Sequence, residues 1–218
     1  MLDKYRLIGR SYDTLSKLYS GNAIQECRLA MLDEELVKTG SKVLFAGAGQ
    51  GDDAIRAAEL GAESTLIDLS PTMMDTNLKL IEKHPDKESL NIKPILGDIL
   101  KHEAKANYDV VVANFFLTVF EKDKMNAVLD HLIKLCKPGG YVIIGDFKTA
   151  SGNIFQKTAQ QAYWLTAATA FFAVAGNAIH GLYNYADLLE KKGLKLCKEQ
   201  TFSVLGQPAF QSILAEKQ

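Results

Sequence analysis

Three closely spaced glycines are the first residues of this sequence that point to chemistry. Gly47, Gly49 and Gly51 lie between a short apolar run and a segment with helical character. Glycine allows a tight turn, and it lets a ligand approach the backbone at the N-terminus of a helix. Asp68 follows 21 residues after Gly47, at the end of the next apolar run. A carboxylate there can accept hydrogen bonds from both hydroxyls of a ribose, so the spacing predicts a site for a cofactor that contains adenosine.

The acidic residues beside these glycines separate the candidate cofactors. Residues 49–54 fit the looser glycine pattern of dinucleotide sites, but Asp52 and Asp53 would then lie where a pyrophosphate binds. Two carboxylates beside two phosphates are unfavourable by on the order of 1 kcal/mol each, even at a high effective dielectric constant. S-adenosylmethionine carries no phosphate, and its ammonium and sulfonium groups are both cations. The charge pattern therefore favours S-adenosylmethionine over a nicotinamide dinucleotide.

The elements that must position these residues alternate along the chain. Apolar periodicity and the glycine and proline signals predict helices over residues 22–37, 52–60, 71–84, 122–136 and 187–192. They predict strands over residues 42–46, 64–68, 92–96, 108–113, 141–145, 194–202 and 209–215. This alternation indicates an α/β fold of the Rossmann-like, doubly wound type. We expect a mostly parallel seven-stranded sheet with an antiparallel C-terminal strand and helices on both faces.

Length and composition fit one domain of 218 residues. Its 25 Lys and Arg residues nearly balance 26 Asp and Glu residues, which argues against binding to nucleic acid through concentrated positive charge. The three cysteines lack CxxC spacing and the four histidines form no ligand pattern, so we expect no metal. Charges within the first ten residues argue against a signal peptide, and the uncharged stretch 162–176 is too short to span a bilayer. We expect a cytoplasmic protein without stable membrane insertion.

Taken together, the motifs resemble those of the class I S-adenosylmethionine-dependent methyltransferases, in the branch that acts on quinones and other small molecules. The resemblance covers residues 41–147 and, more loosely, the rest of the chain. The segments that carry it are 43–51, 67–70, 97–99, 108–114 and the Lys137-Pro138-Gly139-Gly140 turn. It implies a single methyltransferase domain over 1–218. That domain would comprise a helical cap (1–40), a cofactor-binding core (41–147), a variable helical lid (148–192) and C-terminal strands (193–218).

The resemblance also implies roles for individual residues. The glycine loop would receive the methionine part of the cofactor, Asp68 the ribose, and Asp98 the adenine amino group. Asn114 would close the site over the methionine part, and Tyr12 of the cap would either pack against the domain or contact the ligand. The implied cofactor-binding residues are Tyr12, Gly47, Ala48, Gly49, Gly51, Asp68, Leu69, Met73, Asp98, Ile99 and Asn114.

One position departs from the family pattern. The residue two places before the first glycine is usually acidic and lies near the cofactor's ammonium group, but here it is Phe45. Asp52, Asp53 or backbone carbonyl groups would then serve the ammonium. If they do not, a Phe45→Asp substitution is expected to tighten cofactor binding, unless the new carboxylate is buried without a partner.

The sequence defines the acceptor side less closely. Displacement at a methyl group gains from positioning and desolvation, and a general base is optional. The candidate bases are Asp146, His180, Tyr183 and Tyr185. The aromatic residues of 162–176, which include Tyr163 and Trp164, would form a core helix, a subunit contact, a lid over an apolar acceptor or a contact with a membrane surface.

The sequence therefore predicts an enzyme that transfers a methyl group from S-adenosylmethionine to a small, apolar or aromatic acceptor, such as a quinone-like molecule. Two alternatives stay open. One is another enzyme on this fold, which uses NAD or uses S-adenosylmethionine for different chemistry. The other is a protein that binds S-adenosylmethionine without turnover. The expected partner is the small-molecule acceptor and no nucleic acid, and a homodimer is compatible with the apolar stretch.

Overall fold

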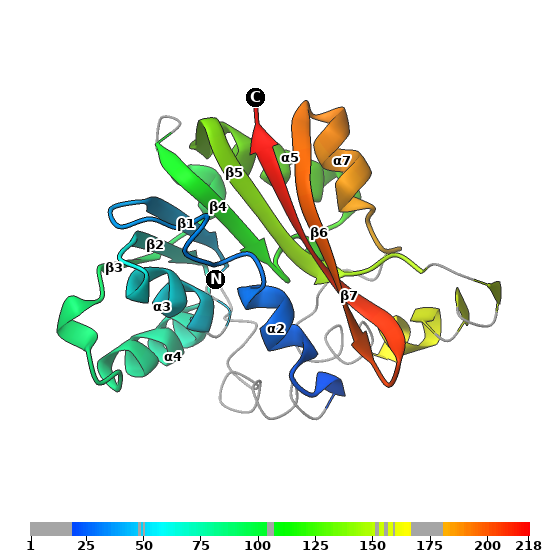
Figure 1. The fold of residues 1–218 in the computed structure, drawn as a ribbon, viewed down its shortest axis with the longest axis horizontal. Helices are drawn as coiled ribbons and strands as arrows, with labels where there is room; N and C mark the ends of the chain where they lie inside the picture. The colour runs from blue at the N-terminus through cyan, green and yellow to red at the C-terminus, as the bar shows by residue number, and fades with distance from the viewer. Residues whose placement is uncertain are drawn as a thin grey trace.

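The computed structural model describes residues 19–47, 49, 51–103, 107–150, 153–154, 157–158, 160–166 and 181–218. The described strands form one sheet in the order β3-β2-β1-β4-β5-β7-β6 (Figure 1). They are β1 (Lys42–Ala46), β2 (Glu63–Asp68), β3 (Ile92–Leu96), β4 (Tyr108–Asn114), β5 (Cys136–Phe147), β6 (Leu194–Val204) and β7 (Gln207–Lys217). The helices are α2 (Ala23–Leu29), α3 (Asp52–Glu59), α4 (Pro71–Glu82), α5 (Lys122–Leu135) and α7 (Tyr185–Lys191). Short 3₁₀ turns follow as η1 (Lys87–Ser89), η2 (Ile99–Lys101) and η3 (Leu117–Val119).

Strand pairing confirms the predicted fold class. β1 pairs in parallel with β2 and β4, β2 pairs with β3, and β4 pairs with β5. β7 pairs antiparallel with both β5 and β6. Among the described strands, six therefore share one direction and β7 runs against them. This is the mostly parallel seven-stranded sheet with an antiparallel C-terminal strand that the sequence predicts.

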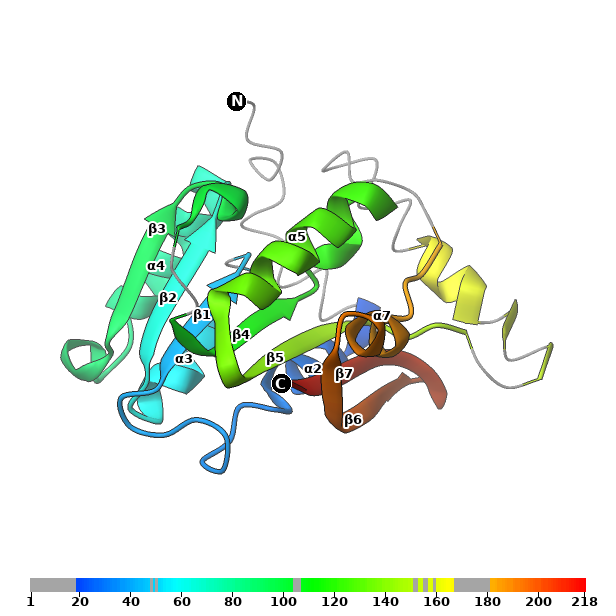
Figure 2. The same cartoon turned by 90° about the horizontal axis from the view of Figure 1, so that it is seen from above.

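Helices cover both faces of the sheet (Figure 2). On one face, α5 and α7 pack on an apolar cluster that includes Leu44 and Val111 of the strands. On the other face, α3 packs over Phe45 and Val112. The two sets alternate along β1 and β4 because successive side chains of a strand point to opposite faces. Near-continuous apolar strands of this kind are typical of parallel sheets that are buried on both sides.

The helix predicted over residues 22–37 is shorter in the structure, and α2 ends at Leu29. Beyond its end, Oδ1 of Asp33 accepts hydrogen bonds of 3.0 Å from the N–H groups of both Glu35 and Leu36, which holds residues 33–36 in a separate turn. A side chain that binds its local backbone in this way competes with helical hydrogen bonds. Met31 and Val37 are still buried in the core. The apolar spacing predicted the burial of these residues and the start of the helix correctly, but it placed the end of the helix too far along the chain.

The last three strands are longer than the sequence predicts. β5 begins at Cys136 and includes the Lys137-Pro138-Gly139-Gly140 segment expected to be a turn. The register of β4 with β5 shifts between Tyr108 and Val110, which accommodates these residues within the strand. β6 and β7 meet at Leu205 and Gly206, whose φ angles are 50° and 76°. Two consecutive positive φ angles suit a two-residue hairpin turn, so the hairpin stays paired nearly to its tip.

Part of the uncharged stretch, residues 167–176, lies outside the described residues. Its first part, residues 162–166, is helical together with residues 160 and 161. Within the portion of the chain that the structure describes, no helix combines the length and the apolar character needed to cross a membrane.

Candidate active site

The glycine loop joins the end of β1 to the start of α3. Gly47, Gly49 and Gly51 have positive φ angles of 81°, 48° and 85°, a region that side-chain-bearing residues rarely adopt. A Cβ atom at Gly47 would lie 2.6 Å from Cδ2 of Phe116, and one at Gly51 would lie 1.9 Å from Oδ1 of Asn77. The conformation and the close neighbours together require glycine at these two positions. Ala48 lies outside the described residues.

Two predicted carboxylates follow neighbouring strands beside this loop. Asp68 ends β2, and its Oδ1 accepts a hydrogen bond of 2.7 Å from the N–H of Ser70. Asp98 follows β3, and its Oδ1 accepts one of 3.0 Å from the N–H of Leu100. The N–H of Gly97 donates to the carbonyl of Asp68 over 2.8 Å, which ties the two strand ends together. Both carboxylates therefore lie at the carboxyl edge of the sheet, next to the point between β1 and β4 where the strand order reverses.

Three apolar residues among the implied cofactor-binding residues differ in burial. Leu69 keeps 51% of its surface exposed, whereas Ile99 and Met73 each keep 5%. Ser70 caps α4, because its Oγ accepts a hydrogen bond of 3.2 Å from the N–H of Met73. Leu69 thus offers apolar surface directly after the predicted ribose carboxylate, while Met73 and Ile99 support that edge from beneath.

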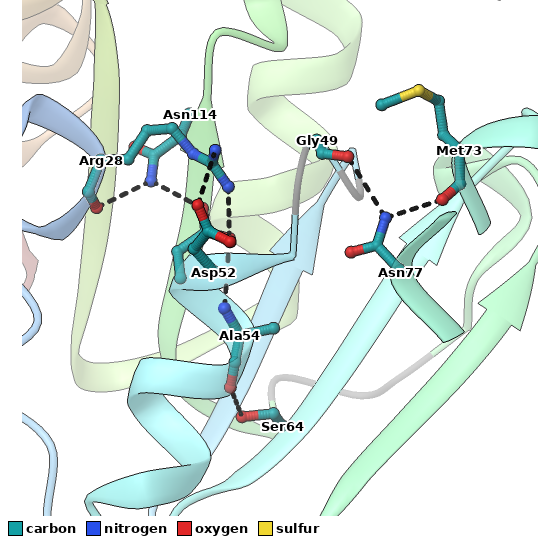
Figure 3. A network of polar contacts seen from close by, with 9 residues as sticks. Arg28, Gly49, Asp52, Ala54, Ser64, Met73, Asn77 and Asn114 are labelled. Atoms are coloured by element: carbon teal, nitrogen blue, oxygen red, sulfur yellow. Dashed lines mark hydrogen bonds and ion pairs between the residues drawn. The ribbon is translucent and has the colours of Figure 1, made fainter. Parts of the chain in front are cut away.

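A buried polar network flanks the glycine loop on its α2 side (Figure 3). Nη2 of Arg28 lies 3.0 Å from Oδ1 of Asp53, and Nη1 lies 3.9 Å from Oδ2 of Asp52. Asn114 donates from Nδ2 to the carbonyl of Arg28 and to Oδ2 of Asp53, both over 3.1 Å. The side chains of Arg28 and Asp53 are 6% and 7% exposed, and that of Asp52 is 31% exposed. One guanidinium therefore faces two carboxylates, which leaves a net negative charge beside the loop.

Phe45 is a core residue. It is 1% exposed, and it pairs across the sheet with Leu66 of β2 and Val112 of β4. Its ring packs in the apolar cluster beneath α3. The structure thus places an apolar ring where the family pattern has an acid, and it places carboxylates on α3 instead, at Asp52 and Asp53.

The candidate bases lie on or near β5 and α7. Asp146 is 1% exposed. Its Oδ2 accepts a hydrogen bond of 2.9 Å from the hydroxyl of Tyr185, and its Oδ1 accepts one of 2.7 Å from the N–H of Phe147. The hydroxyl of Tyr183 donates to the carbonyl of Phe120 over 2.9 Å. His180, like Tyr12 of the N-terminal cap, lies outside the described residues. The structure therefore joins Asp146 to Tyr185 and holds Tyr183 against a backbone carbonyl.

Burial raises the pKa of Asp146 from its ordinary value of 3.8 to about 7, although hydrogen bonds from Phe147, Tyr185 and Thr118 act to lower it. Between these two pH values the folded protein binds more protons than the unfolded chain does. The contribution of Asp146 to stability is therefore complete below pH ~4 and is lost as the pH rises through ~7, at up to about 1.4 kcal/mol per pH unit.

This linkage predicts the outcome of an Asp146→Asn substitution. Asparagine still accepts a hydrogen bond and does not ionise, so the variant gains stability relative to the native protein as the pH rises from 4 to 8. Urea unfolding at several pH values measures the difference. Taking the difference between the two proteins removes the contribution of His102, whose lowered pKa, caused mainly by burial, acts in the opposite direction. A difference that does not change with pH would contradict the prediction.

An aromatic cluster lies at the carboxyl end of β5. Tyr163 and Trp164 pack against a group of buried residues that includes Phe147 and Phe210. Tyr163 also stacks on Tyr19, with ring centroids 4.3 Å apart, and each tyrosine hydroxyl donates to the other's carbonyl, over 2.6 and 3.0 Å. The described part of the predicted lid is therefore attached to the segment that begins α2.

The described residues 19–47, 49, 51–103, 107–150, 153–154, 157–158, 160–166 and 181–218 include three of the four histidines. Within them, no group of three His, Cys, Asp or Glu side chains is arranged to hold a metal ion. Two of the histidines have other partners: Nε2 of His102 lies 2.9 Å from the hydroxyl of Tyr108, and Nε2 of His131 lies 3.2 Å from the carbonyl of His102. These contacts fit a structural role for both rings.

Sequence reasoning missed two residues at the loop, Arg28 and Asn77. Arg28 comes at the end of an apolar helix pattern and carried no motif, and Asn77 lies within α4 among residues of mixed character. The available signal was that each is a polar residue on the apolar side of its helix. Both are almost completely buried in the structure.

Together these observations define an α/β domain with a glycine loop at the carboxyl edge of its sheet. Residues 44–142 match the family model described as a methyltransferase domain. With the seven-stranded fold, this match supports the resemblance to the class I S-adenosylmethionine-dependent methyltransferases.

Individual relatives fit this assignment. The chain is 30% identical over 115 residues to a fibrillarin-like rRNA/tRNA 2'-O-methyltransferase of Methanococcus voltae, covering 52% of this chain and 48% of the relative. It is 23% identical over 152 residues to the ubiquinone/menaquinone biosynthesis C-methyltransferase UbiE of Cereibacter sphaeroides, covering 68% of this chain and 59% of the relative. The matches thus span about half to three fifths of these relatives.

A solved structure extends the similarity over nearly all of the chain. The crystal structure of 1,6-didemethyltoxoflavin-N1-methyltransferase from Burkholderia thailandensis, with 1,6-didemethyltoxoflavin and S-adenosylhomocysteine bound, superposes with a TM-score of 0.69. It covers 98% of this chain and 86% of that chain at 17% sequence identity. At this level of identity the likeness shows the shared fold.

Proposed function

We propose that this protein transfers a methyl group from S-adenosylmethionine to a small apolar or aromatic molecule. The observation that carries the proposal is the edge formed by the glycine loop, Asp68 and Asp98. The glycines leave no room for side chains at Gly47 and Gly51, and the two carboxylates follow adjacent strands. A cofactor with a cationic amino-acid end, a ribose and an adenine fits this series of groups.

Each part of the cofactor has a proposed partner. Asp68 accepts hydrogen bonds from the ribose hydroxyls, Asp98 accepts one from the adenine amino group, and Leu69 and Ile99 lie beside the adenine ring. Asp52 serves the ammonium group, because its side chain is the more exposed of the two carboxylates beside Arg28. Residues from Gly47 to Gly51 and Asn114 complete the site around the methionine part, with Met73 behind them and Tyr12 as a contact from the cap.

When bound, S-adenosylmethionine supplies an electrophilic methyl group to a nucleophilic atom of the acceptor; the carbon–sulfur bond breaks and its electron pair stays on sulfur, which gives S-adenosylhomocysteine. The protein's own contribution is positioning and the exclusion of water. Asp146, Tyr183 and His180 remain the proposed bases for an acceptor that must lose a proton. Asp146 is itself held by Tyr185 and buried, which favours a role in fixing the end of β5.

The proposed acceptor is a small molecule and not a nucleic acid. The near balance of 25 basic and 26 acidic residues provides little of the positive charge that a phosphate backbone requires. The aromatic side chains Tyr163 and Trp164, beside Phe147 and Phe210, favour an aromatic or lipophilic partner. The similar proteins include a ubiquinone/menaquinone biosynthesis C-methyltransferase and a 1,6-didemethyltoxoflavin-N1-methyltransferase, and both support the same class of acceptor. A cytoplasmic location and a homodimer stay predictions.

Calorimetry with two ligands tests the proposed cofactor site. S-adenosylhomocysteine contains the amino-acid end, and 5'-methylthioadenosine lacks it. We expect Asp68→Ala to weaken both ligands by roughly 10- to 150-fold, the loss of charge-assisted hydrogen bonds to the ribose. We expect Asp52→Asn to weaken only S-adenosylhomocysteine, by roughly 1.5- to 5-fold, because water screens a partly exposed pair. Failure of the native protein to bind S-adenosylhomocysteine would overturn the proposed function.

A further inference from the structure

Asn77 lies on α4 and faces the glycine loop from the side opposite Arg28 (Figure 3). The residue is fully buried, at 0% exposure. Its Nδ2 donates to the carbonyl of Met73 over 2.8 Å, within its own helix, and to the carbonyl of Gly49 over 3.2 Å. The second bond joins residues 28 positions apart and reaches the middle of the loop.

The two bonds fix the orientation of the Asn77 amide. Both partners are carbonyl oxygens, which only accept, so the nitrogen of the amide must face them. Oδ1 then points towards Gly51. A Cβ atom added to Gly51 would lie only 1.9 Å from this oxygen. Asn77 therefore contacts two of the three loop glycines, one through each end of its amide.

Oδ1 of Asn77 is a buried side-chain acceptor without a hydrogen-bond partner among the described residues. Leaving such an atom unpaired is unfavourable, and an apolar side chain of similar size would avoid the cost. The bond to Met73 does not explain the asparagine, since it only repeats a contact that the helix backbone already makes nearby. The bond to Gly49 is the contact that an apolar residue could not replace.

We propose that Asn77 is a positioning residue that holds the glycine loop in the shape that receives the amino-acid end of the cofactor. This inference rests on the proposed function. The N–H of Gly47 donates to the carbonyl of Ile67 over 2.9 Å, and Gly51 is the N-cap of α3, where its carbonyl accepts from the N–H of Ile55 over 3.0 Å, so both ends of the loop are anchored by backbone. Asn77 supplies a side-chain anchor between those ends, at Gly49.

The test uses two variants that separate the two hydrogen bonds. Asn77→Ala loses both bonds. Asn77→Ser keeps a bond to the carbonyl of Met73, since serine in a helix reaches the carbonyl four residues earlier, but it is too short to reach Gly49. Asn126 of α5 provides a matched control, because its Nδ2 donates to the carbonyl of Lys122, also four residues earlier, and it is half-buried on a helix other than α4. Asn126→Ala and Asn126→Ser report the value of that helical bond alone.

Calorimetry on all five proteins, with S-adenosylhomocysteine and 5'-methylthioadenosine, gives the ratio of the two affinities. We expect both Asn77 variants to bind S-adenosylhomocysteine roughly 2- to 12-fold more weakly than the native protein does, because one net hydrogen bond that shapes the loop is lost. Their affinity for 5'-methylthioadenosine should stay within about twofold of the native affinity. The Asn126 variants should leave both affinities unchanged. A purely structural role would lower stability without moving the ratio of affinities.

Three outcomes decide the question. If both Asn77 variants lose affinity for S-adenosylhomocysteine relative to 5'-methylthioadenosine, the positioning role is supported. Native affinity for S-adenosylhomocysteine in a folded Asn77→Ser protein, or an equal loss for both ligands, overturns the positioning role and leaves the proposed function intact. If the native protein binds 5'-methylthioadenosine and S-adenosylhomocysteine equally well, the loop does not receive the amino-acid end, and the inference also fails. If Asn77→Ala does not fold, Asn77→Ser alone decides.

Discussion

Replacing Phe45 by aspartate is expected to destabilise the protein strongly and not to tighten cofactor binding. The sequence left both results open, but the ring is 1% exposed and lies between Leu66 and Val112. The substitution removes a large buried ring, which by itself costs about 3–5 kcal/mol. It also puts a carboxyl group in an apolar cluster, where it must either stay protonated or bury an unpaired charge. The sum is comparable to the whole stability of a typical domain, about 5–15 kcal/mol.

Urea unfolding at pH 7 measures this effect, with Phe45→Leu as the control. Leucine keeps the site apolar and should cost far less than aspartate. The burial argument is wrong if the Phe45→Asp protein has the same urea unfolding midpoint as the native protein and binds S-adenosylhomocysteine more tightly. In that case the position does face the ammonium group.

Arg28 should produce the second large effect. An Arg28→Met substitution keeps most of the side-chain volume but leaves the carboxylate of Asp53 buried without its cation, and Asp53 is 7% exposed. Breaking a buried pair from one side typically costs about 3–5 kcal/mol. We therefore expect a loss of that size in the free energy of unfolding. Arg56 gives a matched control, because its pair with Glu59 lies 3.6 Å apart at the surface and should contribute less than about 1 kcal/mol.

A double-mutant cycle shows whether the loss comes from the stranded charge. Combining Arg28→Met with Asp53→Asn removes both charges, so the double variant should be more stable than the sum of the single effects predicts. Strictly additive effects would mean that Arg28 stabilises the fold through packing of its long side chain and not through Asp53.

The sequence predicted the parts of this molecule that depend on local patterns. The strands that carry the glycine loop and Asp68 are short apolar runs bounded by glycine or polar residues, and such signals need no information about distant residues. The mostly parallel pairing of the strands followed from their alternation with helices. The errors occurred where a local side chain bonds the backbone, as Asp33 does in the turn after α2, or where pairing extended a strand, as in β6 and β7.

The supports of the site could not be predicted in the same way. Arg28 meets Asp53 across 25 positions of the chain, and Asn114 meets Asp53 across 61. Such contacts depend on how helices settle on the sheet, which a single sequence does not encode in any short motif. Burial is a similar case: Asp146 has the residue type and the place of a base, but the ring of Tyr185 and the sheet enclose it. The residue type of Asp146 suggested that it acts as a base, and its burial limits its access to an acceptor.

The way in which α2 is held has a consequence for the folding of the chain. Cys27 of this early helix donates to the carbonyl of Gln211 in β7, 184 positions later, and Tyr19 stacks on Tyr163. When the protein is synthesised, α2 emerges long before β6 and β7, which complete the sheet beneath it. Contacts between residues so far apart are slow to form, because a long loop must first close. The apolar side of α2 therefore stays uncovered until β6 and β7 have been synthesised. A ribosome-bound chain that lacks this C-terminal hairpin would expose that side, and chaperones could bind it.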